Sequence, residues 1–258
     1  MGRPKSPDPH APLVRPVTGK GGPFLRGPAV MVSSGPDLKP MAKALGIPPE
    51  SSRPFFIGRF YQDPAVPAVV CGPVMGAPYA VFALEYLMAW GARPLFYLGW
   101  CGTLREEIEA GAVIVPPSAY VEEGTSGLYH QEMCTGMDPA PSSAADPALS
   151  GHLFQVLSGL GANVVSGPVW TTDAIFRETR AKVSAFAGLG AVAVDMETSA
   201  LFTVARMAGV PLAAALVVSD SVHGGKWTPG FNRKEFLAGR KFAVEALCRI
   251  VSELTRKP

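Results

Sequence analysis

Short valine-rich runs alternate with helix-like segments along most of this chain, and that alternation limits the folds it can adopt. Runs of this length, most of them bounded by glycine or proline, are typical of strands buried on both faces. Strands that alternate with helices predict an α/β fold, with a central, largely parallel sheet that helices cover on both faces. The runs are AVMVS (29–33), AVVCG (68–72), PLFYLG (94–99), AVIVP (112–116), NVVSGPVW (163–170), AVAV (191–194) and LAAALVVS (212–219).

Three segments between or after these runs have helical spacing. Residues 77–92 are apolar nearly all round, which predicts a helix buried on several sides. Residues 197–209 carry one apolar face and end at a glycine, and residues 232–255 carry a long apolar stripe. Residues 121–148 show no periodicity. We expect them to form a long loop over one end of the sheet, and loops of that length are often functional.

Composition excludes several classes of function. The 258 residues are 48% hydrophobic and 17% charged with a net charge of +2, which suits a large core and a subunit interface but gives no basic face for nucleic acid. The four cysteines form no CxxC pair, so we expect no zinc site or disulfide framework and a cytoplasmic location. No uninterrupted apolar run reaches the roughly 18 residues of a membrane span.

The N-terminal segment differs from the rest of the chain. Residues 1–27 are rich in proline, glycine and charge, and they contain no apolar core of a signal peptide. This composition predicts a mobile arm, although a segment that reaches over a neighbouring subunit is an alternative. The folded domain is then expected to cover residues 28–258.

Acidic side chains follow two of the predicted strands. Asp195 and Glu197 come after the run at 191–194, and Asp220 comes after the run at 212–219. Ligands of open α/β sheets bind at the carboxyl ends of strands. Contacts with a ligand there can offset the free-energy cost of burying an acid. The two strand ends are therefore the first candidates for a functional site.

Four blocks of sequence around these strand ends resemble the nucleoside phosphorylase family, which includes purine nucleoside phosphorylases, uridine phosphorylases and methylthioadenosine nucleosidases. They occur in the family's order and spacing, so the resemblance covers about residues 29–250. It implies a single domain around a twisted mixed sheet, assembled as dimers or trimers of dimers. The blocks are 72-GPVMGAPYAVFALEYLMAWGA-92, 99-GWCGTL-104 with 111-GAVIVPPSAYVEEGTS-126, 167-GPVWTTDAIFRE-178 with 195-DMETSALF-202, and 217-VVSDS-221.

The resemblance assigns roles to the residues at the strand ends. Glu197 matches the family glutamate that accepts hydrogen bonds from the ribose 2′- and 3′-hydroxyls, a task that suits an acceptor-only carboxylate. Met196 matches a methionine that packs under the nucleoside. Asp220 matches the acid that serves N7 of a departing purine, although an Asx turn is its structural alternative. Asp195 fits an N-cap of its helix better than a catalytic role.

The segment after Thr171 is expected to contact the sugar and the base. By alignment, Thr172 belongs to this segment. Either Ile175 or Phe176 covers the nucleoside, and Phe176 would do so with an aromatic face. Glu178 lies where uridine phosphorylases carry a glutamine that reads uracil. The alternative for Glu178 is the start of a surface helix.

The phosphate site departs from the family pattern. Residues 33–40, SSGPDLKP, replace the usual glycine-rich turn with its arginine and leave Gly35 and Lys39 as candidates. Tyr97 replaces a second arginine, and Trp100 replaces a hydroxyl residue. A lysine can still bind phosphate, but without the bidentate fork of arginine.

Three further residues are candidates for the missing phosphate contacts. The resemblance implies that Arg53 or Arg59 acts from an adjacent subunit, because the family often contributes one arginine across the dimer, and Thr103 offers a hydroxyl. Surface solvation is the alternative for each arginine.

The sequence therefore predicts a phosphorylase that uses inorganic phosphate to cleave a nucleoside, by preference a purine nucleoside, to free base and ribose 1-phosphate. Alternatives are a nucleosidase that uses water, a uridine phosphorylase, and a nucleoside-binding protein without catalysis. We expect no cofactor, metal, nucleic acid or membrane partner, and a homo-oligomer as the working form.

Overall fold

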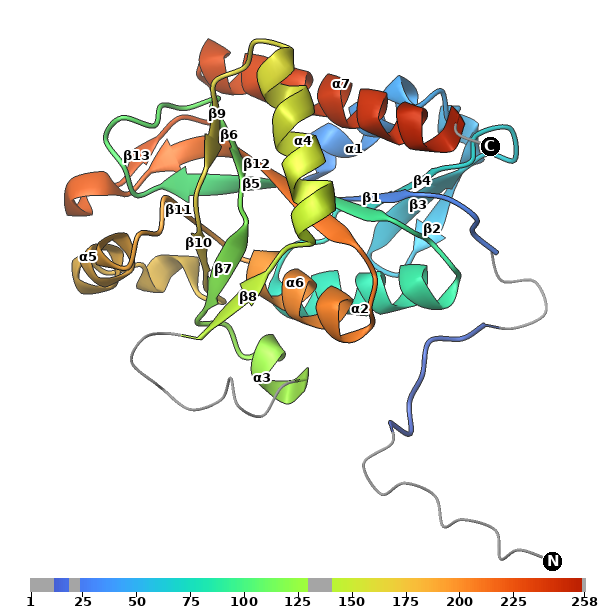
Figure 1. Ribbon diagram of the computed structural model, residues 1–258, viewed down its shortest axis with the longest axis horizontal. Helices are drawn as coiled ribbons and strands as arrows, with labels where there is room; N and C mark the ends of the chain where they lie inside the picture. Colours follow the sequence, from blue (N-terminus) through green and yellow to red (C-terminus); the bar gives the residue numbers. More distant parts are fainter. Residues whose placement is uncertain (1–11, 19–23, 130–140, 257–258) are drawn as a thin grey trace, which may run out of the picture.

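The chain forms a mixed sheet with helices on both of its faces (Figure 1). The computed structural model describes residues 12–18, 24–129 and 141–256. Within these residues the central strands run parallel and the outer ones are mixed in direction, so the expected α/β fold is confirmed. None of the described helices is long and apolar enough to cross a membrane.

Four parallel strands, in the order β4–β1–β5–β12, make the centre of the sheet. Their continuous apolar sequences follow from burial on both faces. The two longest strands run side by side until Thr103 lies opposite Ser221, so their carboxyl ends emerge together. The bounds are β4 Val69–Gly72, β1 Ala29–Val32, β5 Leu95–Thr103 and β12 Leu212–Ser221.

Shorter strands extend the sheet on both sides. An antiparallel hairpin of β2 and β3 adds to β4, while β11, β10, β7 and β8 continue from the end of β5. The strands β6, β9 and β13 join through β12. The bounds are β2 Ser52–Phe55, β3 Gly58–Gln62, β6 Val113–Val115, β7 Ser118–Val121, β8 Ser142–Ala144, β9 Val164–Ser166, β10 Val169–Thr171, β11 Ala193–Asp195 and β13 Thr228–Pro229.

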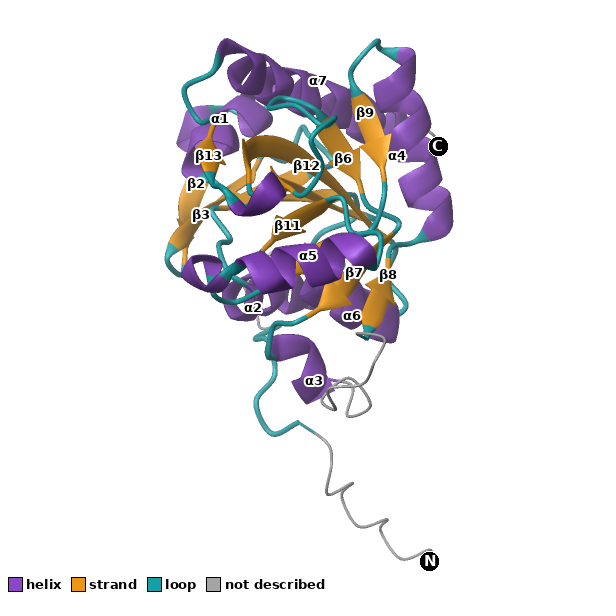
Figure 2. Ribbon diagram, turned by 90° about the vertical axis from the view of Figure 1, so that its left-hand side faces the viewer, coloured by secondary structure: helices purple, strands orange, loops and turns teal. Residues whose placement is uncertain are grey.

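Two helix layers enclose the sheet. The helices α1, α4 and α7 cover one face, α2 and α6 cover the other, and α5 lies beside β7 and β11 (Figures 1 and 2). Their apolar faces build two core clusters, one around Met41 and Leu247, the other around Leu84 and Leu201. The bounds are α1 Gly35–Ala44, α2 Ala77–Ala89, α3 Thr125–Tyr129, α4 Pro147–Gly159, α5 Arg180–Gly188, α6 Thr198–Met207 and α7 Lys234–Arg256.

Two expectations about secondary structure were wrong. The predicted strand 163–170 is two strands, β9 and β10, because Pro168 has no N–H for the ladder and Val192 lies against Gly167. The predicted loop 121–148 contains α3 and β8, and its residues 130–140 lie outside the described chain.

The N-terminal boundary remains a prediction. Residues 1–11 and 19–23 of the expected arm lie outside the described chain. At the other end of that segment Leu25 is buried, and its N–H donates to the Trp90 carbonyl at 2.7 Å, so this end packs at the terminus of α2.

Candidate active site

A cavity of about 290 Å³ lies at the carboxyl ends of the central strands, and both strand-end acids line it. Glu197 enters from the start of α6 and Asp220 from the end of β12. Met196 and Ile175, two of the residues assigned to the nucleoside, also line the cavity. The structure thus brings together, in one cavity, the two acids on which the predicted function depends, Glu197 and Asp220.

Glu197 is buried and rigidly held. Its Oε1 accepts the Gly76 N–H at 2.6 Å, and its Oε2 accepts the Tyr97 hydroxyl at 2.7 Å. Gly76 has φ of 85°, a conformation that favours glycine and lets the backbone approach the carboxylate. Burial and the nearby charge of Asp195 raise the pKa of Glu197 to about 7. The carboxylate is therefore oriented by fixed donors but lacks a neutralising cation among the described residues.

The N-cap position of helix α6 is Glu197 and not Asp195, so the N-cap prediction is wrong in position, although the Asp195 side chain does accept hydrogen bonds at the start of the helix. Its Oδ2 accepts the Thr198 N–H at 2.9 Å, and its Oδ1 accepts the Thr171 hydroxyl at 2.6 Å. Burial raises the pKa of Asp195 above its usual value, although these donated hydrogen bonds oppose the shift. Asp195 therefore positions the start of the helix that carries Glu197.

Asp220 is half-buried and lines the cavity from the carboxyl end of β12. Its Oδ1 accepts the Ser219 hydroxyl at 2.6 Å, and its Oδ2 accepts the Trp227 indole N–H at 2.8 Å. Gly102 of β5 lies beneath it, where a Cβ would come within 3.2 Å of Oδ2. Two hydrogen-bond donors therefore hold this carboxylate at the carboxyl end of β12, and the absence of a side chain at Gly102 leaves room for it.

Glu178 also lines the cavity, although it lies two residues before α5. The helix start expected there is confirmed, because the Thr179 hydroxyl caps α5 by accepting the Lys182 N–H at 3.4 Å. Burial, together with the charges of Asp220 and Glu122, raises the pKa of Glu178 to about 7. Glu178 therefore lies just before the start of surface helix α5 and also lines the cavity.

The region expected to hold phosphate contains an ion pair between a buried carboxylate and a partly buried arginine. Arg240 of α7 lies 2.6 Å from Asp37 Oδ1, and the Trp100 indole N–H donates to Asp37 Oδ2 at 2.6 Å. The Arg240 guanidinium also lies over the Trp100 ring, 5.0 Å from its centroid. Asp37 thus fills the acceptor role beside this arginine that a bound anion would otherwise fill.

The structure does not bring the other assigned residues to the cavity within this chain. Lys39 and Gly35 are exposed on α1, and Thr103 lines a second cavity. Arg53 and Arg59 lie on the edge hairpin, where they contact Gln62 and Ser52. The assignment of these two arginines to an adjacent subunit stays a prediction.

Two residues of the predicted sugar wall also lie outside the cavity. Phe176 is 98% exposed, so Ile175 is the one of the pair that lines the site. Thr172 is buried, and its hydroxyl accepts the Ala174 N–H at 3.4 Å, which orders the following turn.

Three partners of the acids that line the cavity or lie beside it were not predicted from the sequence. Arg240 is a lone charge on the apolar stripe of α7, and such a charge is a usable signal for a buried ion pair. Tyr97 was noticed only as a lost arginine, not as a donor to Glu197. Trp227 follows Gly224, Gly225 and Lys226 outside any periodic pattern, and no sequence signal points to it.

Comparisons with known proteins identify the family of this chain. The model of the phosphorylase superfamily matches residues 29–256. A DeoD-type purine nucleoside phosphorylase of Alkaliphilus metalliredigens (strain QYMF) is 32% identical over 178 residues, 68% of this chain and 74% of that protein.

Solved structures show the same fold at lower identity. A uridine phosphorylase from Vibrio fischeri ES114 superposes with a TM-score of 0.73 at 20% identity, covering 89% of this chain and 93% of that one. A 5′-methylthioadenosine/S-adenosylhomocysteine nucleosidase from Helicobacter pylori superposes with a TM-score of 0.70 at 18% identity, covering 90% of this chain and 100% of that one. With the family model matching nearly the whole chain, this protein belongs to the phosphorylase superfamily of nucleoside-cleaving enzymes.

Proposed function

We propose that this enzyme cleaves the N-ribosidic bond of a purine nucleoside, with phosphate as the acceptor. The observation that carries the proposal is that Glu197 and Asp220 line the same cavity. Cleavage of this bond builds positive charge on the ribose and negative charge on the departing base. An ionised Glu197 that accepts from the ribose hydroxyls stabilises the first charge, and a proton from Asp220 stabilises the second.

Asp220 is the reason to favour a purine. A carboxyl group at the base end can donate to N7 of a leaving purine, whereas a pyrimidine has no corresponding nitrogen. Asp220→Asn is expected to lower kcat/KM for inosine about a hundredfold and to affect uridine much less. Equal losses for the two nucleosides would contradict the purine assignment.

Phosphate as the acceptor is supported by the name of the purine nucleoside phosphorylase relative. It also requires a cation, and none of the residues that line the cavity in the described chain is a lysine, arginine or histidine. A second copy of the chain would have to supply Arg53 or Arg59. We therefore propose a homo-oligomer as the phosphorolytic form.

Hydrolysis is the second candidate, and the charge of the cavity favours it. Four acids, Glu178, Asp195, Glu197 and Asp220, line a space that no cation of the described chain enters. Such a lining repels phosphate but tolerates water, and Arg240, which lies over the Trp100 ring of that lining, is already paired with Asp37.

One experiment separates these candidates. The purified protein is incubated with inosine, adenosine and uridine, with and without phosphate, and free base is followed by chromatography. Base release that requires phosphate supports phosphorolysis, and release without it supports hydrolysis. Release from uridine alone would overturn the purine assignment. No release from any nucleoside, with a nucleoside-dependent rise in Tm, would indicate a binding protein instead.

A further inference from the structure

Glu178 differs from the other acids of the nucleoside cavity because its carboxylate has no hydrogen-bond partner in the described chain. The other three, Asp195, Glu197 and Asp220, each have both carboxylate oxygens engaged by donors of this chain. Glu178 is half-buried in the same cavity, and none of the described residues donates to its carboxylate. Burial of a carboxylate without hydrogen bonds is costly unless a ligand supplies the donors. Glu178 is therefore the acid with acceptor capacity left for a bound base.

A short turn directs Glu178 into the cavity. The 3₁₀ turn Ile175–Arg177 ends at Glu178, whose N–H donates to the Ile175 carbonyl at 3.3 Å. Side chains three residues apart eclipse each other on such a turn, and both Ile175 and Glu178 line the cavity. Directly afterwards the Thr179 hydroxyl caps α5. The apolar side chain that lines the cavity and the unpartnered acid are thus held by one turn.

This turn lies beside the strand end that carries Asp220. Arg180, at the start of α5, donates its Nε–H at 3.1 Å to the carbonyl of Gly225, which lies in the turn after β12. A Cβ at Gly225 would come within 2.5 Å of the Arg180 side chain, so the two segments are in direct contact. Burial and the nearby charges of Asp220 and Glu122 raise the pKa of Glu178, which agrees with this proximity. Glu178 and Asp220 are therefore near neighbours in the cavity.

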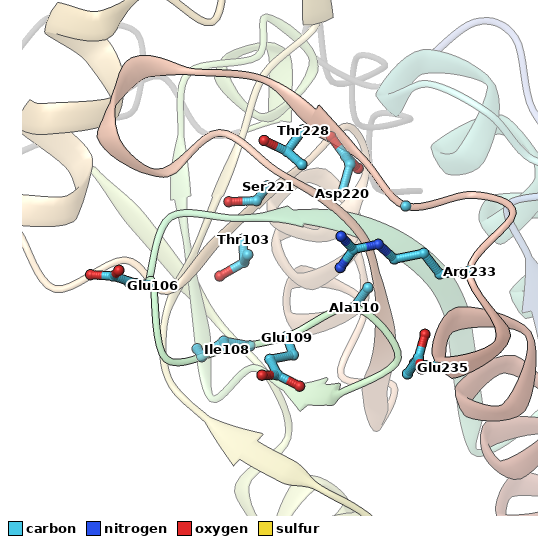
Figure 3. A pocket seen from close by; sticks show the side chains of 11 residues that line it. Thr103, Glu106, Ile108, Glu109, Ala110, Asp220, Ser221, Thr228, Arg233 and Glu235 are labelled. Carbon is cyan, nitrogen blue, oxygen red and sulfur yellow. The ribbon is translucent and has the colours of Figure 1, made fainter.

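Asp220 also lines a second cavity, of about 390 Å³, whose other charged side chains are of both signs (Figure 3). Those residues are exposed to water, whereas Glu178 is half-buried. A base bound beside Asp220 in the nucleoside cavity displaces water from Glu178, whose carboxylate must then find its hydrogen bonds on the base. The exposed residues of the second cavity are Glu106, Glu109, Arg233 and Glu235.

We propose that Glu178 determines specificity at the 6-position of the purine: it accepts a hydrogen bond from a 6-amino group and so favours adenosine over inosine. On the edge that carries N7, adenine presents the N7 acceptor and a 6-amino donor, whereas a 6-oxopurine presents two acceptors. Asp220 serves N7 in the proposed function, on which this inference rests, so the adjacent 6-substituent meets Glu178. An ionised carboxylate can only accept, which suits the amino group and disfavours the carbonyl oxygen.

The test compares kcat/KM for adenosine, inosine and purine riboside, which carries only hydrogen at position 6. At a pH of about 8, above the pKa of about 7, Glu178 is mostly ionised. The wild type should prefer adenosine to inosine by about tenfold or more. Glu178→Gln should lower this ratio about tenfold, because an amide can donate to a 6-oxo group as well as accept. Purine riboside has no 6-substituent and should respond little. The protonation of Asp220 is common to the three substrates and cancels in the ratios.

Arg177→Gln is the matched control, because Arg177 is exposed on the same turn and does not line the cavity. It should leave the ratio of adenosine to inosine unchanged. Three results would each overturn the proposal: a wild type without preference for adenosine, an equal loss of all three activities in Glu178→Gln, and an equal change of the ratio in Arg177→Gln.

Failure of the proposed function can be told apart from failure of this inference. If the wild type cleaves no nucleoside, the proposed function fails, and calorimetric binding of the free bases adenine and hypoxanthine decides the role of Glu178. The wild type should then bind adenine about tenfold more tightly than hypoxanthine, and Glu178→Gln should bind the two bases alike. Equal binding of both bases by the wild type would overturn the assignment of Glu178.

Discussion

Two buried carboxylates beside the cavity, Glu197 and Asp37, share much of their surroundings and differ in one partner. Both are less than 5% exposed, and each accepts a hydrogen bond from an aromatic side chain, Tyr97 or Trp100. Asp37 also has an arginine at 2.6 Å, whereas Glu197 has no ion pair within the described chain. The arginine satisfies the charge of Asp37 internally. Glu197 has no such arginine, and its pKa is raised. When it is ionised, its negative charge is therefore free to stabilise a cationic transition state.

The largest effect that follows from this difference concerns catalysis. Glu197→Ala is expected to lower kcat/KM about a thousandfold, roughly 4 kcal/mol, because it removes the acceptors that the charged sugar needs. Asp37→Asn removes an equally buried charge that does not line the cavity, and the folded variant should keep kcat/KM within a few-fold. Steady-state kinetics of base release check both. Near-normal kcat/KM in Glu197→Ala would remove the ribose assignment.

The next effect concerns stability. Arg240→Met leaves Asp37 buried and unpaired, so it should lower the free energy of unfolding by about 3 kcal/mol. The double variant Asp37→Asn with Arg240→Met should recover most of that loss, because no charge is left without a partner. Urea unfolding of the two variants and the wild type measures this. Equal destabilisation of the single and double variants would show that packing of Arg240 matters more than its charge.

The acids that line the cavity could be predicted from the sequence, whereas the ion pair beside the cavity could not. Glu197 and Asp220 were found from the sequence because strand ends are defined by apolar runs, and burial on both faces makes those runs continuous. The Asp37–Arg240 pair joins residues 203 positions apart, and periodicity carries no information about such a contact. Residues 33–40 were identified only by their place in the family pattern, and helix α1, which begins at Gly35 and contains two prolines, was not predicted.

The hairpin of β2 and β3 shows a second limit. It lies at the edge of the sheet, and its exposed positions include Arg53 and Pro54, so it lacks the valine-rich signature of the central strands. The division of 163–170 into two strands depends on which neighbours β9 and β10 meet. Those partners, β6 and β7, belong to different parts of the sheet.

The uncompensated charge of Glu197 should also appear in the pH dependence of stability. Its pKa is raised from 4.5 to about 7 in the folded protein, so the fold binds a proton that the unfolded chain releases. The stabilisation is complete below pH 4.5 and is lost as the pH rises through 7. Relative to Glu197→Gln, the wild type should lose roughly 3 kcal/mol of unfolding free energy across this window. Parallel curves for the two proteins would contradict the assignment of that pKa.

The smallest effect tests the hydrogen bond that Glu197 receives in place of a cation. Tyr97→Phe removes the hydroxyl that donates to Oε2 at 2.7 Å, a loss of about 1 kcal/mol for the ionised carboxylate. Its pKa should therefore rise further. Because the ionised form serves the sugar, activity is present above this pKa and disappears as the pH falls through it. The low-pH limb of kcat/KM should thus move up by about 0.5 to 1 unit. Trp100→Phe removes the matched donor from Asp37 and should lower stability without moving that limb. A shift of the limb in both variants would mean that the charges of Glu197 and Asp37 are coupled. Arg240 would then not prevent the charge of Asp37 from affecting catalysis.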